Sequence, residues 1–233
     1  WAALIGAILL GARKGRFDEE GKSTPLSGSS MPQVAIGTFI LWFGWFGFNG
    51  GSQLSIATAE DVSAVAKIFV NTNIAAAAGV ITVIIVNQAS IGRLDVPMVL
   101  NGALAGLVAI TAGPLAPSLP VALAIGAIGA LVMIAASMLL DKLKIDDVVG
   151  AIPVHLGAGI WGTLAVAVFD PEVKIVTQLI GISSIGLFVC ITSFILWAGM
   201  KYTYGIRLKW SKERVGADLS ELGVRAYNLD FND

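Results

Sequence analysis

The stretch Leu119–Leu140, LPVALAIGAIGALVMIAASMLL, holds 22 residues without a charged side chain. A helix needs about 20 apolar residues to cross a hydrocarbon core roughly 30 Å thick. The stretch is too long for a β-strand, and its apolar residues do not alternate with a period of two. It therefore predicts a membrane-spanning helix.

Other parts of the chain repeat this pattern. The first segment, Trp1–Ala12, is apolar, but twelve helical residues extend only about 18 Å. It therefore predicts the cytoplasmic end of a spanning helix whose beginning is missing. We expect an all-α polytopic membrane protein with six full transmembrane helices plus a partial one. The five further full spans are Val34–Leu54, Val62–Val86, Pro97–Leu115, Val149–Phe169 and Ile175–Met200.

The composition also favours a membrane protein. Hydrophobic residues make up 56% of the 233 residues and charged residues 13%, whereas soluble domains carry about 25% charged residues. This excludes an ordinary soluble enzyme, a disordered tail and a nucleic-acid binder, and the net charge of -1 offers no field for an acidic partner. With one cysteine, Cys190, and one histidine, His155, we expect no disulfide, metal centre or cofactor.

Lysine and arginine are distributed unequally over the loops. Alternate loops and the C-terminal tail hold 13 of them, whereas the intervening loops hold only Lys174. Because cytoplasmic loops carry the excess of positive charge, we place the first set and the C-terminus in the cytoplasm. The predicted divisions are a truncated helix end (1–12), a cytoplasmic loop (13–33), a six-helix bundle (34–200) and a cytoplasmic tail (201–233).

Small and polar residues within the spans predict close helix packing. Helices in lipid approach closely where small residues repeat every four positions, and polar groups there form interhelical hydrogen bonds. The small residues are Gly102 and Gly106, then Ala122, Gly126 and Ala130, then Ala158 and Gly162; the polar group is Asn71, Thr72 and Asn73.

Aromatic residues gather at the outer end of one span, in the sequence LWFGWFGFNGGS (Leu41–Ser52). They suit the aromatic belt of a membrane interface. Glycines between the rings also expose ring faces, which attract small cations. The residues alone leave both interpretations open.

The segment DDVVGAIPVH (Asp146–His155) combines the chain's histidine with two carboxylates. Asp146 and Asp147 suit the positive end of a helix dipole, which is a structural role, and Pro153 frees a backbone carbonyl. His155 follows Asp147 by eight residues, or about 12 Å along a helix, near the middle of the membrane. A neutral imidazole there can pass a proton, bond a small polar solute, or simply pack. No carboxylate in the spans pairs with it, so we expect no enzyme.

Together these segments resemble the ammonium transporter family (Amt/Mep/Rh), and specifically its Amt/Mep branch. The resemblance implies the end of the fifth helix through the eleventh helix plus the cytoplasmic tail, which form the second inverted repeat. It also implies a homotrimer with a narrow hydrophobic pore in each subunit. The matching stretches are Trp42–Ser52, Phe69–Gly79, Asn101–Thr111, Ile145–Phe169 and Tyr204–Tyr227.

The resemblance assigns roles to five residues. Phe48 matches one of two stacked phenylalanines that gate the outer mouth, and Ser52 matches the serine of the outer ammonium recruitment site. Trp45 matches a pore-lining tryptophan beneath the gate, and His155 the second of two central histidines. Thr111 matches a threonine near the pore. In the family, ammonium is recruited by the rings and the hydroxyl, then loses its water and proton before it passes the histidines.

Some family features lie outside these residues. The second gate phenylalanine, the outer tryptophan, the structural aspartate and the first histidine belong to earlier helices. Many relatives read His-Gly-Glu where Leu222, Gly223 and Val224 stand in the tail. This departure bears on docking of a nitrogen-regulatory PII-type protein at the cytoplasmic face.

Three functions follow as hypotheses. The first is an ammonium transporter of the plasma membrane, whose partners are ammonium or ammonia, the lipid bilayer and further copies of the chain, with no nucleic acid. The second is an ammonium-sensing receptor built on a transporter-like bundle. The third is a non-conducting truncated subunit that only assembles with others.

Overall fold

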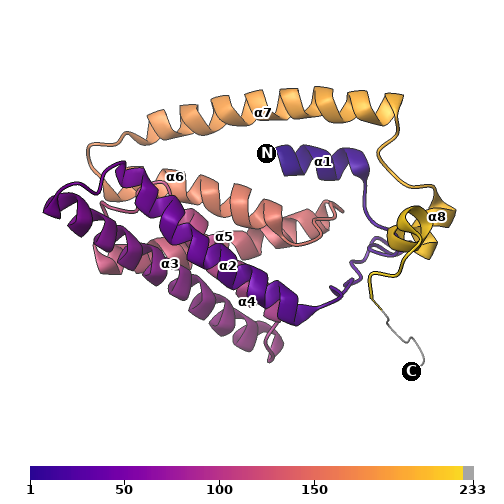
Figure 1. The fold of residues 1–233 in the computed structure, drawn as a ribbon, viewed down its shortest axis with the longest axis horizontal. Coiled ribbons are helices and arrows are strands. Elements are labelled where there is room, and N and C mark those ends of the chain that lie inside the picture. Colours follow the sequence, from indigo (N-terminus) through magenta and orange to yellow (C-terminus); the bar gives the residue numbers. More distant parts are fainter. Residues whose placement is uncertain (228–233) are drawn as a thin grey trace.

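A computed structural model describes residues 1–227, and within them the fold is helical without a β-sheet (Figure 1). This confirms the all-α class. The helices are α1 (Ala2–Leu10), α2 (Met31–Gly50), α3 (Ala59–Ile91), α4 (Val96–Ile110), α5 (Leu119–Lys142), α6 (Ala158–Phe169), α7 (Ile175–Thr203) and α8 (Trp210–Val215). Short helical turns occur at η1 (Gly51–Gln53), η2 (Ile152–Gly157) and η3 (Asp218–Leu222). The last part of the predicted tail, residues 228–233, lies outside the described residues.

Within residues 1–227, five segments are long and apolar enough to cross a membrane. They are α2 with η1, α3, α5, η2 with α6, and α7. A shorter apolar helix, α4, differs from the predicted stretch Pro97–Leu115 because it has only 15 residues and ends at Ile110. Gly113, Pro114 and Pro117 follow, and proline cannot continue a helical hydrogen-bond ladder.

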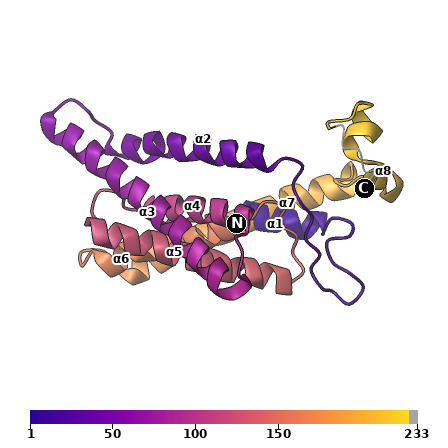
Figure 2. The same ribbon diagram turned by 90° about the horizontal axis from the view of Figure 1, so that it is seen from below.

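The helices form layers around α3, α4 and α5 (Figures 1 and 2). Helix α2 packs against α3 and α4, while α7 runs along α6 with α1 beside it. The central helices meet at glycines. A Cβ on Gly106 of α4 or on Gly126 of α5 would overlap the backbone of Ala75 in α3. Backbone-to-backbone contact of this kind is what small residues permit in a membrane.

Amide side chains join α2, α3 and the turn after α4. Asn49 of α2 donates through Nδ2 to Oγ1 of Thr72 in α3 at 2.9 Å. Asn71 donates to the carbonyl oxygens of Pro114 and Pro117 at 2.9 and 3.0 Å, which fixes the turn after α4. Asn49, Asn71 and Thr72 are fully buried, whereas the neighbouring Asn73 is exposed.

Ion pairs join the segment after α1 to the end of α5 and the residues that follow it. Arg13, just after α1, donates through Nε and Nη2 to the Asp146 carboxylate at 2.7 and 2.9 Å, and its backbone N–H adds a third bond at 2.9 Å. Arg16 pairs with Asp141 at 2.5 Å and approaches Asp146 at 3.4 Å. The Arg13 guanidinium holds the pKa of Asp146 below its usual range.

The tail closes over the end of α1. Arg207 pairs with Glu213 at 2.6 Å and donates to the carbonyl of Leu10 at 3.2 Å. Lys201 donates to the carbonyl of Leu9 at 2.7 Å. Two cations therefore satisfy carbonyls that a helix C-terminus leaves without an intrahelical partner.

Candidate functional site

Helix α2 presents aromatic residues on one face. Leu41, Trp45 and Phe48 follow at spacings of four and three, so they lie along one side of the helix. All three border an open cavity of about 660 Å³. Phe43 points elsewhere: the residue is 79% exposed and borders a separate groove between α2 and α3.

His155 reaches the same cavity from a wide helical turn. Residues 152–157 form a π-helical turn that continues into α6. Gly159 and Thr163 follow His155 at intervals of four and also border the cavity. A four-residue periodicity starting from the histidine would have found these two positions in the sequence.

The predicted separation of about 12 Å along a helix between Asp147 and His155 is wrong, because residues 147–150 are not helical. His155 instead lies four residues beyond the helix start at Ala151. The cavity that His155 borders is also lined by Ile40 and Leu41, which stand at the middle of α2.

Asp146 and Asp147 have different roles before the helical turn that carries His155. Asp147 accepts hydrogen bonds from the backbone N–H groups of Gly150 and Ile152 at 3.1 and 2.6 Å, so it caps the turn that leads to His155. Asp146 does not cap the helix. Its buried carboxylate faces Arg13 instead.

Sequence reasoning missed one residue that supports this turn. Proline has no N–H, so Pro153 leaves the carbonyl of Val149, four residues earlier, without its helical partner. Asn101 of α4 donates to that carbonyl at 3.0 Å. Its amide also lies where a Cβ on Gly150 would stand, and Gly150 has a φ of +77° that favours glycine. Pro153 in the sequence already predicted a carbonyl without a helical partner. That Asn101 is the side chain that bonds this carbonyl is decided only by the fold.

We therefore expect Asn101→Ala to loosen the start of the His155 helix. Loss of one such hydrogen bond costs about 1 kcal/mol. The measurement is hydrogen exchange of the amides in residues 149–157, which should speed up while exchange within α3 stays unchanged. Asn101→Gln and Asn87→Ala, a buried amide change elsewhere, serve as comparisons; equal exchange in Asn101→Ala and the parent protein would contradict the role.

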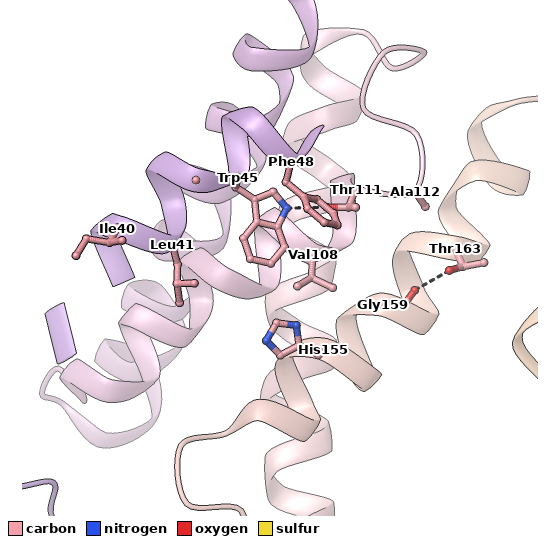
Figure 3. Close-up of a pocket in the computed structure, with 11 residues that line it drawn as sticks. Ile40, Leu41, Trp45, Phe48, Val108, Thr111, Ala112, His155, Gly159 and Thr163 are labelled. Atoms are coloured by element: carbon pink, nitrogen blue, oxygen red, sulfur yellow. Dashed lines mark hydrogen bonds between the residues drawn. The ribbon is translucent and has the colours of Figure 1, made fainter. Parts of the chain in front are cut away.

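Three rings line the cavity from two sides (Figure 3). The ring centroids of Trp45 and His155 are 6.3 Å apart and their planes differ by only 17°. Phe48 tilts at 58° to Trp45, with 5.9 Å between the centroids. Val108 and Ala112 complete the lining with apolar surface, and the lining holds no charged side chain.

Thr111 lies beside the tryptophan. The indole Nε1 of Trp45 donates to Oγ1 of Thr111 at 2.8 Å, and that hydroxyl donates to the carbonyl of Leu107 at 2.7 Å. The cavity thus brings together Trp45, Phe48, Thr111 and His155 among the predicted site residues.

Ser52 stands apart from this group. It belongs to η1, is exposed, and does not border the cavity. Its hydroxyl donates to the carbonyl of Phe48 at 3.4 Å, which places it one turn beyond the phenylalanine, just after the C-terminal end of α2.

These features define a class: a helical integral membrane protein with an apolar, aromatic cavity and one histidine between its helices. Comparison with known proteins identifies the family. The model described as Ammonium Transporter Family matches residues 1–227, and the chain belongs to this family. Its members are transporters rather than enzymes.

Individual relatives agree with this assignment. Ammonium transporter Amt2 of Archaeoglobus fulgidus is 40% identical across 97% of this chain and 52% of its own length. Ammonium transporter Amt1 of Haloferax mediterranei is 36% identical, over 97% of this chain and 46% of its own length. The chain thus spans about half the length of the curated relatives it matches.

Solved structures show the same fold. One named Sensor Amt Protein matches 95% of this chain and 56% of its own, with a TM-score of 0.84 and 33% identity. The crystal structure of Candida albicans Mep2 matches 90% of this chain and 50% of its own, with a TM-score of 0.78 and 27% identity.

Proposed function

We propose that this chain forms part of a channel-like ammonium transporter, in which ammonium or ammonia moves through the cavity beside His155. Ser52 and Phe48 receive ammonium at the outer mouth, and Phe48 acts as a gate. Trp45 and Thr111 lie beneath it, and His155 is the central polar group.

The observation that carries the proposal is the meeting of Trp45, Phe48 and His155 around one open, uncharged cavity. Ring faces attract a small cation by about 0.5–2 kcal/mol each, which favours ammonium at the mouth. An apolar passage disfavours the ion and favours neutral ammonia. A neutral imidazole offers one donor and one acceptor to such a solute without placing a permanent charge in the membrane.

The assembly and surroundings are part of the proposal. We place the transporter in the plasma membrane as a homotrimer with its C-terminus in the cytoplasm, without a cofactor and without catalytic activity. The tail around α8 and η3 is the candidate surface for a PII-type regulatory protein. Leu222, Gly223 and Val224 in and after η3 depart from the family pattern at that surface.

Uptake of labelled methylammonium tests the proposal, with the protein expressed from its complete reading frame in a host that lacks ammonium transport. Phe48→Ala should lower uptake at least about tenfold, since the ring at the mouth is lost. Phe43→Ala, a matched change on the same helix outside the cavity, should leave uptake within about twofold. Equal uptake by Phe48→Ala and the parent protein would reject the gate.

A sensor is the second candidate, because one of the similar solved structures is named Sensor Amt Protein. Reading the coding sequence that follows Asp233 separates the two: a kinase or cyclase domain favours a receptor, and a stop codon a transporter. The third candidate, a non-conducting subunit, requires mixed trimers with full-length partners, which the mass of the detergent-extracted complex reveals.

A further inference from the structure

The orientation of the Trp45 ring shapes the cavity. The indole lies nearly parallel to the imidazole of His155 and stands between it and Phe48. A tryptophan side chain rotates about two bonds. Apolar contacts of the ring carbons restrict these rotations less than a directional hydrogen bond does. The one polar group of the side chain is the indole N–H, which can only donate a hydrogen bond.

The Thr111 hydroxyl accepts a hydrogen bond from this indole N–H while it donates its own proton to another group. A hydroxyl has one proton, and Thr111 places it on the carbonyl of Leu107 at 2.7 Å. The lone pairs that remain accept from Nε1 of Trp45 at 2.8 Å. The hydroxyl therefore cannot donate to the nitrogen of ammonia without giving up the Leu107 bond. This geometry favours an action on the tryptophan over direct recognition of the solute.

The backbone beneath Thr111 is held in place. Thr111 is the residue after the last turn of α4, and its N–H bonds the carbonyl of Val108 at 3.2 Å. The following turn is anchored by the buried amide of Asn71, which bonds Pro114 and Pro117. The acceptor for the indole is thus fixed to both α4 and α3.

We propose that Thr111 is a positioning residue that keeps the indole of Trp45 parallel to the imidazole of His155 across the cavity. The inference rests on the proposed function, because it concerns how the solute passes between these rings. Without the acceptor, the indole turns into the open space in front of His155 and obstructs it. The position of the Phe48 ring at the mouth of the cavity does not change when the acceptor is lost.

Two substitutions separate the hydrogen bond from the shape of the side chain. Thr111→Val keeps the shape and removes the acceptor, whereas Thr111→Ser keeps the acceptor and removes a methyl group. For methylammonium uptake by the complete protein, Thr111→Val should lower the maximal rate about tenfold with the apparent KM within about twofold. Thr111→Ser should keep both within about twofold. Equal amounts of membrane-inserted protein confirm that the variants fold.

A spectroscopic readout reports on the ring itself. In ultraviolet resonance Raman spectra of the purified protein, Thr111→Val should shift one indole N–H band toward the value of an unbonded N–H. The shift should be absent when the same change is made in a Trp45→Phe background, and there Thr111→Val should lower uptake by less than about twofold.

Several outcomes would overturn the inference. These are an unchanged N–H band in Thr111→Val, an unchanged rate despite the shifted band, and additive losses in the Trp45→Phe background. Loss of uptake in Thr111→Ser with the band retained would assign the effect to the methyl group instead. A parent protein that moves no methylammonium contradicts the proposed function, and the Raman bands then decide the orientation of Trp45 separately.

Discussion

Replacement of Gly126 by alanine is expected to lower the thermal unfolding midpoint of the detergent-solubilised protein by about 5–10 °C. The new Cβ would overlap the backbone of Ala75 in α3, which cannot move aside as a flexible side chain does. Helix α5 must then shift away from α3. Overpacking at a buried backbone contact costs about 3 kcal/mol.

The control is Gly199→Ala in α7, where nothing lies within 4 Å of the added carbon. Alanine favours a helix over glycine by about 0.5–1 kcal/mol, so this variant should melt at or slightly above the parent protein. Intrinsic fluorescence during heating measures both. A midpoint for Gly126→Ala equal to that of Gly199→Ala would show that α3 and α5 do not meet as described.

Arg13→Ala is expected to destabilise the protein by about 2–3 kcal/mol. The Asp146 side chain is only 2% exposed, and this change removes its bidentate partner while leaving the charge in place. Asp146→Asn should cost less, because the side chain of Arg13 is 37% exposed and its guanidinium can turn to water. The exposed Arg93→Ala serves as the control and should leave stability unchanged.

The same pair predicts a pH dependence. Arg13 holds the pKa of Asp146 below its usual value of about 3.9. The stabilisation is therefore present above pH 4 and is lost as the pH falls through the lowered pKa of the folded protein. The midpoint difference between the parent protein and Asp146→Asn should be constant from pH 8 to pH 5 and should shrink in stronger acid. A difference that persists unchanged in strong acid would contradict the ion pair.

Most of the fold could be predicted because apolar length and helix breakers are local properties. Leu119–Leu140 is found as α5 within two residues of its end. The exceptions arise where local signals compete. Helix α4 ends before Gly113 and Pro114, and the start of the His155 helix moves to Ala151 because Asp147 caps a non-helical turn.

The candidate site was only partly accessible from the residues. Trp45 and Phe48 share a helix face by spacing alone, and His155 stood out as a lone polar group in an apolar span. That Asn101 bonds Val149 and that Thr111 bonds Trp45 are relations across 48 and 66 positions of the chain. Periodicity along one helix carries no information about such partners.

By itself the sequence determined that this chain crosses a membrane with helices and which side chains are polar within them, because both follow from the burial cost of each residue in lipid. Only the tertiary structure decided which helices touch, since the glycines at Gly106 and Gly126 could face any neighbour until both met Ala75. That contact sets how the central helices lie, and it is the fold that brings Thr111, just after α4, within hydrogen-bond distance of the Trp45 indole and Trp45 beside His155.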